Sequence, residues 1–101
     1  MELTKKNLNG LKRIAHELSP AFRIGKNGIT ENSLKAISDY IKAHEIIKIK
    51  LLEIPEGETM KSVAEDLTKK LEGNLISVVG GAIVIFKRNA QKVVIDFKEF
   101  K

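Results

Sequence analysis

The sequence predicts an α/β domain whose elements follow the order α-β-α-β-α-β-β. Three segments carry apolar residues at helical spacing, and four shorter segments run or alternate in apolar residues as strands do. Turn residues separate these segments. A length of 101 residues and a hydrophobic fraction of 43% fit a single globular domain over residues 1–101. We therefore expect a sheet covered by helices in two or three layers.

The first helix is predicted over residues 4–18 and the first strand over residues 21–24. Thr4 can cap the helix, and Pro20 ends it because the residue before a proline avoids helical geometry. The inward face of this helix is formed by Leu8, Leu11, Ile14, Ala15 and Leu18.

A second helix is predicted from Thr30, as N-cap, to near His44, followed by a strand over residues 46–52. The strand alternates clearly. Ile47, Ile49 and Leu51 point one way, whereas Lys48 and Lys50 point the other. This pattern predicts one buried face and one basic face.

The third helix is predicted to begin after Thr59 and to end at Gly73. Two apolar strands, residues 75–79 and 82–86, then flank Gly80-Gly81 and indicate a tight antiparallel hairpin. Residues 93–97 form either a short final strand or a loosely paired tail.

The net charge of +5 is unevenly distributed. Residues 1–50 contain ten basic and five acidic side chains, whereas residues 51–101 contain eight of each. All the excess positive charge therefore lies in the first half, which favours a polyanionic partner. A lysine-rich solubilising surface is the alternative interpretation.

The loop Gly25-Lys26-Asn27-Gly28 is the main candidate for binding RNA. Glycines allow positive φ and let a ligand approach the backbone, Lys26 adds a mobile cation, and the following helix start favours an anion. Loops of the G-x-x-G type clamp nucleic-acid backbone in KH domains. An ordinary turn with an exposed lysine remains the alternative.

Further basic candidates for the RNA-binding surface lie on other elements. They are Lys12 and Arg13 on the first helix, Lys48 and Lys50 on the second strand, and Arg88 after the last strand. The few aromatic residues do not form the paired pattern of an RRM sheet. We therefore expect contacts to RNA backbone to dominate and sequence specificity to be modest.

Several function classes are disfavoured by the sequence. It contains no cysteine, and His16 and His44 lack further ligands at metal-binding spacing. We expect His16 to be a hydrogen-bonded structural residue. No catalytic triad or carboxylate pair stands out. We expect no enzyme activity, cofactor or metal, no signal peptide or membrane span, a cytoplasmic location and a monomer.

An ordered set of motifs resembles the YhbY-like, CRM-domain family (chloroplast RNA splicing and ribosome maturation). The set comprises Leu11, Ala15, His16, Leu18 and Pro20, then IGKNGITE at 24–31, HEIIKIK at 44–50, VVG at 78–80 and IVIFKR at 83–88. The resemblance implies a mainly four-stranded mixed sheet, similar to the C-terminal domain of the third translation initiation factor. It also implies RNA binding through Gly25, Lys26, Asn27 and Gly28, and less directly through Lys48 and Lys50.

The resemblance further implies a ribosome-assembly factor that contacts ribosomal RNA in the precursor of the large subunit. The sequence departs from the family at Gly81 and Ala82, where a basic residue and a threonine are usual. The alternative function is a protein-interaction module that docks on a ribosomal protein or another acidic partner. An enzyme for a small phosphorylated ligand is a third option, although the sequence names no catalytic group.

Overall fold

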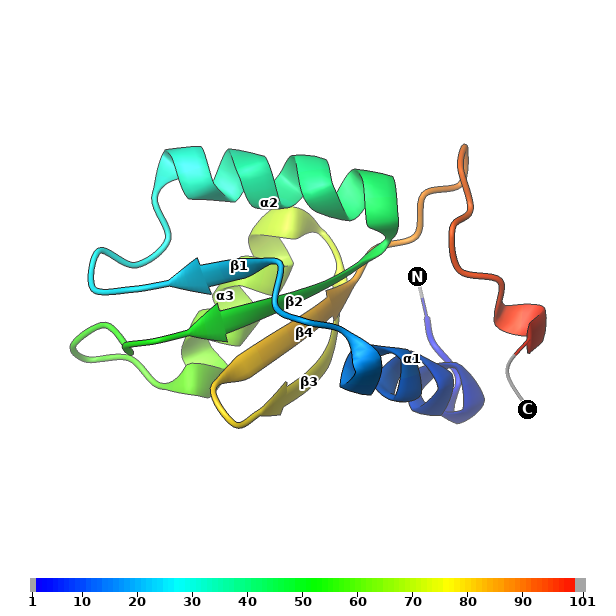
Figure 1. Cartoon of the computed structure of the whole chain (residues 1–101), viewed down its shortest axis with the longest axis horizontal. Coiled ribbons are helices and arrows are strands. Elements are labelled where there is room, and N and C mark those ends of the chain that lie inside the picture. The colour runs from blue at the N-terminus through cyan, green and yellow to red at the C-terminus, as the bar shows by residue number, and fades with distance from the viewer. Residues whose placement is uncertain (1, 100–101) are drawn as a thin grey trace.

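The computed structural model describes residues 2–99, and its elements occur in the predicted order (Figure 1). The elements are α1 (Lys5–Glu17), β1 (Phe22–Ile24), α2 (Glu31–His44), β2 (Ile46–Leu51), α3 (Met60–Leu71), β3 (Asn74–Val79), β4 (Ala82–Phe86) and the short 3-10 helix η1 (Phe97–Glu99). The predicted helices and the four main strands are thus confirmed to within about two residues at their ends.

The four strands form one mixed sheet in the order β1-β2-β4-β3. Strand β1 is parallel to β2, whereas β2 and β3 both run antiparallel to β4. The predicted hairpin turns through Gly80 and Gly81, whose φ angles of 59° and 79° lie in the left-handed region that glycine tolerates. The α/β fold with a four-stranded mixed sheet is therefore confirmed.

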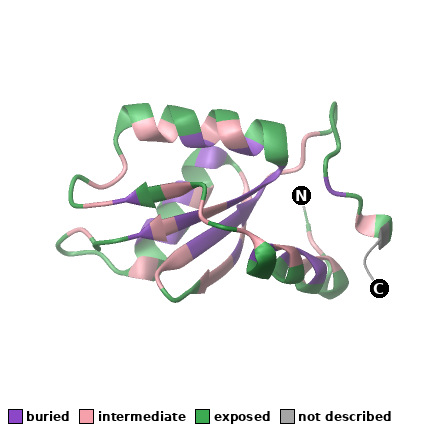
Figure 2. Ribbon diagram, in the orientation of Figure 1, coloured by how far each residue is buried: buried purple, intermediate pink, exposed green. Residues whose placement is uncertain are grey.

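Helices cover both faces of this sheet, giving three layers. Helices α2 and α3 pack on one face, and α1 packs on the other (Figure 1). Figure 2 shows the buried residues concentrated on the central strands, β2 and β4. Alternate residues of β2 serve the two faces: Ile47, Ile49 and Leu51 pack under α2 and α3, whereas Ile46 packs near α1.

All three predicted threonine N-caps are confirmed. Thr4, Thr30 and Thr59 each accept a hydrogen bond from the backbone N–H three residues later and so satisfy a donor at the helix start. The side chains three residues on are Asn7, Ser33 and Ser62, and each accepts a hydrogen bond from the cap backbone in return. These local bonds fix where the helices begin.

Two sequence expectations differ from the structure. The left-handed residue that ends α3 is Glu72, with φ 56°, rather than Gly73. Gly73 is needed for space, because a Cβ atom there would lie 2.9 Å from Ile85 Cγ2 and 3.0 Å from the carbonyl oxygen of Phe86. Of the two alternatives for residues 93–97, the strand is wrong: these residues form a tail whose Ile95 is buried against the α1 face.

A β-bulge in β3 affects the α1 face. The pairing with β4 shifts between Leu75 and Ser77, so that Ile76 and Ser77 both serve this face. Ile76 enters the core beneath α1, and Ser77 lines the open area beside it.

Candidate functional site

An open groove of about 670 Å³ lies on the α1 face of the sheet. Its lining residues come from the second half of α1, from Pro20 and from all four strands. Four of them carry permanent positive charge: Lys12, Arg23, Lys48 and Lys50. The groove thus concentrates cations from three different elements.

Strand pairing explains why Arg23 and Lys50 meet. They are partners in the parallel ladder between β1 and β2, so their side chains emerge side by side on the same face. The neighbours of Arg23, Phe22 and Ile24, point to the opposite face and pack in the core beneath α2 and α3. Burial of these two neighbours therefore fixes the direction of Arg23.

Lys48 and Lys50 are hydrogen-bonded to the two sides of the groove. The ammonium of Lys48 donates to the carbonyl oxygens of Ala15 and Leu18, both at 3.2 Å, at the end of α1. The ammonium of Lys50 donates to the carbonyl oxygen of Gly80 at 2.6 Å, at the hairpin turn. A cation is favourable at a helix C-terminus, where the helix dipole is negative. Both lysines are only partly exposed, yet they keep positive charge in the groove.

The sign of the charge around the groove is uniform. Among residues 2–99, no aspartate or glutamate lines it. A smaller cleft of about 140 Å³ beside α3 is lined instead by Glu53, Glu58 and Asp66, with Lys70. Positive charge is therefore gathered on the α1 face, whereas the cleft beside α3 is acidic.

The loop Gly25-Lys26-Asn27-Gly28 lies beyond the end of the groove and is not part of its lining. It follows β1 at the same end of the sheet as the hairpin turn (Figure 1). The backbone N–H of Gly28 donates to the carbonyl oxygen of Gly25 at 3.0 Å, which closes the turn.

The two glycines of this loop have different structural roles. Gly28 has a positive φ of 66°, so a side chain there would strain the backbone. Gly25 has no positive φ, and a Cβ atom added to it would meet nothing within 4 Å. The expectation of positive φ therefore holds for Gly28 only, and the fold itself does not require glycine at position 25.

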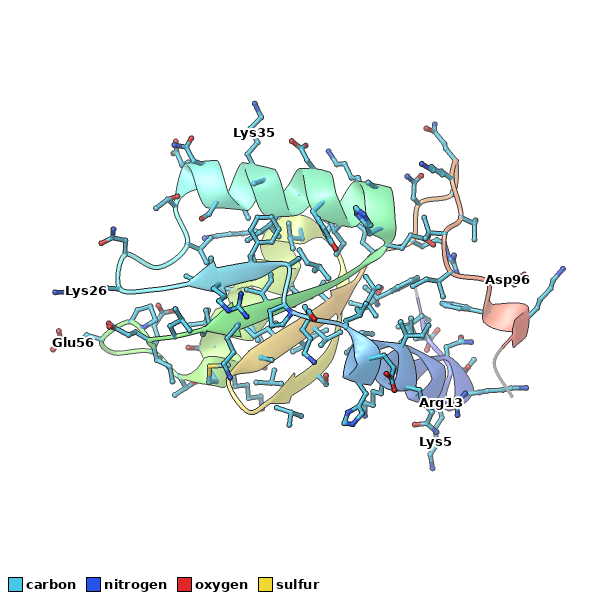
Figure 3. The ribbon with its side chains drawn as sticks, in the orientation of Figure 1. Lys5, Arg13, Lys26, Lys35, Glu56 and Asp96 are labelled. Carbon is cyan, nitrogen blue, oxygen red and sulfur yellow. The ribbon has the colours of Figure 1, made fainter. Side chains whose placement is uncertain are left out.

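Lys26 projects from the end of the sheet, at the same end as Glu56 (Figure 3). The loop that carries Glu56 is close, because a Cβ on Gly28 would lie 3.9 Å from Cγ of Pro55. Lys26 and Asn27 are both exposed. Acidic side chains thus border the loop on the α3 side, and the basic groove lies on the other side of the sheet.

Arg88 lies away from the groove and is engaged within the fold. Its Nη1 donates to both carboxylate oxygens of Glu45 at 3.1 Å and to the carbonyl oxygen of Ile95 at 2.8 Å. Its guanidinium also stacks over the rings of Phe86 and Phe97. The structure therefore gives Arg88 a packing role that the sequence did not indicate, and we do not include it in the proposed RNA surface.

Glu45 anchors the segment that follows β4. It is fully buried, and its carboxylate also accepts hydrogen bonds from the backbone N–H groups of Asn89, Val94 and Ile95. Burial alone would raise the pKa of Glu45, but these three N–H groups and the charge of Arg88 outweigh it and lower the pKa. The ionised carboxylate is thus the form that fits this site.

Of the candidates named from sequence, the groove brings together Lys12, Lys48 and Lys50. Arg13 is exposed on α1 but does not line the groove. Sequence reasoning missed Arg23, although its place between two apolar strand residues could have indicated an exposed basic position. It took His16 for a hydrogen-bonded structural residue, whereas the structure places this exposed side chain in the lining of the groove.

No group of three histidine, aspartate or glutamate side chains in residues 2–99 is arranged to hold a metal ion. Within the same residues, no helix is long and apolar enough to cross a membrane.

Comparison with known proteins matches this chain to one family. The family model of the CRS1 / YhbY (CRM) domain matches residues 3–87. The Bacillus subtilis protein named "Probable RNA-binding protein YqeI" is 35% identical over 94 residues, which cover 93% of this chain and 97% of that protein. A Haemophilus influenzae protein named "RNA-binding protein" is 28% identical over 85 residues, covering 84% of this chain and 85% of that one.

Solved structures give the same result for the fold. The solution structure of the hypothetical protein SAV1595 from Staphylococcus aureus matches with a TM-score of 0.70 and 35% identity. The match covers 91% of this chain and 99% of that chain.

Proposed function

The chain belongs to the CRS1/YhbY (CRM) domain family, and we propose that it binds RNA along the basic groove and the adjacent Gly25–Gly28 loop. The RNA proposed is ribosomal RNA in the precursor of the large ribosomal subunit, so the protein acts as a ribosome-assembly factor. The names of its relatives support the RNA partner.

The observation that carries the proposal is the cation cluster of the groove. Lys12, Arg23, Lys48 and Lys50 line one depression with no acidic residue among its described lining. Such an arrangement neutralises phosphates and releases their counterions, so affinity should fall steeply as salt rises. The acidic side chains of the cleft beside α3 repel phosphate and favour a path for RNA over the α1 face.

The Gly25–Gly28 loop would extend this surface beyond the groove. Open space at Gly25 leaves room for a ligand to approach the backbone closely. Exposed Lys26 can place a cation beside the same phosphate. This role depends on close approach, so a side chain at position 25 should weaken RNA binding without straining the fold.

The test is RNA binding measured by fluorescence anisotropy over a series of salt concentrations. The double variant Lys12→Ala/Arg23→Ala removes two exposed groove cations that form no part of the core. The matched control Lys35→Ala/Lys69→Ala removes the same charge from α2 and α3, outside the groove. We expect the groove variant to bind RNA more weakly. The slope of log affinity against log salt concentration should also become shallower by about 1.5, and the control should show neither change.

The loop is tested in the same assay with Gly25→Val. We expect weaker RNA binding and little change in thermal stability, because position 25 has no positive φ and a Cβ atom there would meet nothing within 4 Å. Equal losses for the groove variant and the Lys35→Ala/Lys69→Ala control would refute the groove as the binding surface. Wild-type affinity for Gly25→Val would refute the role of the loop.

The ribosomal part of the proposal is tested by sucrose-gradient sedimentation of a tagged chain in lysate. The wild type should sediment with large-subunit particles, whereas Lys12→Ala/Arg23→Ala should remain at the top. Wild type that stays at the top at low salt would contradict ribosome assembly. Association that survives removal of RNA by RNase would favour the alternative function, docking on a ribosomal protein or another acidic partner.

A further inference from the structure

Large apolar side chains stand exposed beside the cations of the groove. Leu52 is 59% exposed and Val79 is 72% exposed, and both line the groove at the hairpin end. The opposite wall carries the exposed ring of His16 and the partly exposed Pro20. Adjacent exposed apolar side chains in a concave site indicate a ligand that has an apolar surface of its own.

We propose that the groove binds an unpaired stretch of RNA, with its phosphates on the cations and its bases against Leu52 and Val79. This inference rests on the proposed function and specifies the class of RNA. In an A-form duplex the base faces are covered by stacking, so the protein meets only phosphates, hydroxyl groups and base edges. Leu52 and Val79 would gain nothing from such a ligand, whereas the unstacked bases of a single strand or a loop would cover them.

The register of the strands brings charge and apolar surface together at the hairpin end of the groove. Lys50 pairs with Ala82 across the sheet, and Ala82 pairs in turn with Val79. The small side chain of Ala82 leaves room for the Lys50 side chain, whose ammonium reaches the carbonyl oxygen of Gly80, the residue after Val79. A single strand in the groove would set a phosphate beside this ammonium and a neighbouring base against Val79.

The wall formed by α1 can supply a stacking partner. His16 lies in the last turn of α1 and brings an aromatic ring to the groove. Histidine is among the side chains on which unstacked RNA bases pack. The depression, at about 670 Å³, has the volume of a small-ligand pocket, and this suits one or two extruded nucleotides better than a duplex.

The test compares two RNAs of equal total nucleotide number and charge: an unstructured single strand and a blunt-ended duplex without unpaired bases. The variant Leu52→Ser/Val79→Ser replaces two exposed apolar side chains, so the fold should be retained. The control is Val93→Ser/Val94→Ser, which replaces two comparably exposed valines outside the groove. Circular dichroism and thermal melting verify that both variants are folded.

We expect the wild type to bind the single strand about tenfold more tightly than the duplex. Leu52→Ser/Val79→Ser should weaken single-strand binding by about tenfold while leaving its salt slope and the affinity for the duplex unchanged. The valine control should match the wild type for both RNAs.

Two results would overturn the inference, and they are distinguishable from failure of the proposed function. Equal affinity for the two RNAs would show that unpaired bases are not recognised. Unchanged single-strand affinity in Leu52→Ser/Val79→Ser would show that the apolar pair makes no contact. Salt-independent or absent binding of both RNAs would instead refute RNA binding itself.

Discussion

The α1 face of the sheet has two halves of opposite character, although the same strands build both. In one half, β2 and β4 contribute Ile46, Val84 and Phe86 to a core that α1 and Ile95 cover. In the other half, the same face of β2 continues into Lys48 and Lys50 and is left open as the groove. A single alternating strand therefore serves first as core and then as candidate binding surface.

The boundary between the halves is where α1 ends. The last turn of the helix presents carbonyl groups toward β2, and Lys48 binds two of them. Without that cation, the negative end of the helix dipole would face the open groove. The position of the C-terminus of α1 therefore decides which part of this face is core and which part is open.

The largest effect is expected in the covered half, from Phe86→Ala. Phe86 is fully buried and its ring packs 5.4 Å from that of Phe97 between ring centroids. Its truncation leaves a cavity and should lower the free energy of unfolding by about 4 kcal/mol. Val79→Ala, on the same face in the open half, should change it by less than about 0.5 kcal/mol. Urea denaturation measures both, and similar losses for the two variants would contradict the division into halves.

An intermediate effect on stability is expected from Glu45→Gln. The substitution loosens the segment after β4, whose Ile95 helps to cover the core on the α1 face. The substitution keeps the shape of the side chain but removes the buried charge that pairs with the partly exposed Arg88, so the loss at pH 7 should be about 3 kcal/mol. The folded-state pKa of Glu45 is lowered, so its stabilisation is present above the ordinary value of 4.5 and is lost as pH falls through the folded value.

The free energies of unfolding of the wild type and of Glu45→Gln should therefore approach each other in acid. Urea denaturation at neutral pH and at a series of values below 4.5 would measure the gap in free energy of unfolding, which should narrow as pH falls. The other carboxylates titrate in both proteins and cancel in the comparison. A gap that stays constant across this range would contradict a stabilising ionised Glu45.

The sequence predicted the fold well because its signals are local. Threonine caps fixed the helix starts, and the alternation in residues 46–52 assigned Ile47 and Lys48 to opposite faces before any tertiary information. The failures concern long-range packing. The space that Gly73 leaves for Ile85, and the burial of Ile95 without a strand, depend on parts of the chain far apart in sequence.

The candidate site was predicted only in part for the same reason. Lys48 and Lys50 could be found from alternation alone, but the groove they line exists because α1 stops beside them. Arg23 joins them through parallel pairing with β2, which no local pattern reveals. Arg88 was misleading because its partner, Glu45, lies 43 residues earlier in the chain.

The smallest effect on stability is expected at the boundary, from Lys48→Ala. The variant loses two hydrogen bonds to carbonyl groups at the end of α1 and the favourable charge at the helix dipole, which should cost about 1 kcal/mol. Lys35→Ala, an exposed lysine on α2, should cost less than about 0.5 kcal/mol. Urea denaturation of both variants tests this difference. No greater loss for Lys48→Ala than for Lys35→Ala would mean that Lys48 does not stabilise the end of α1.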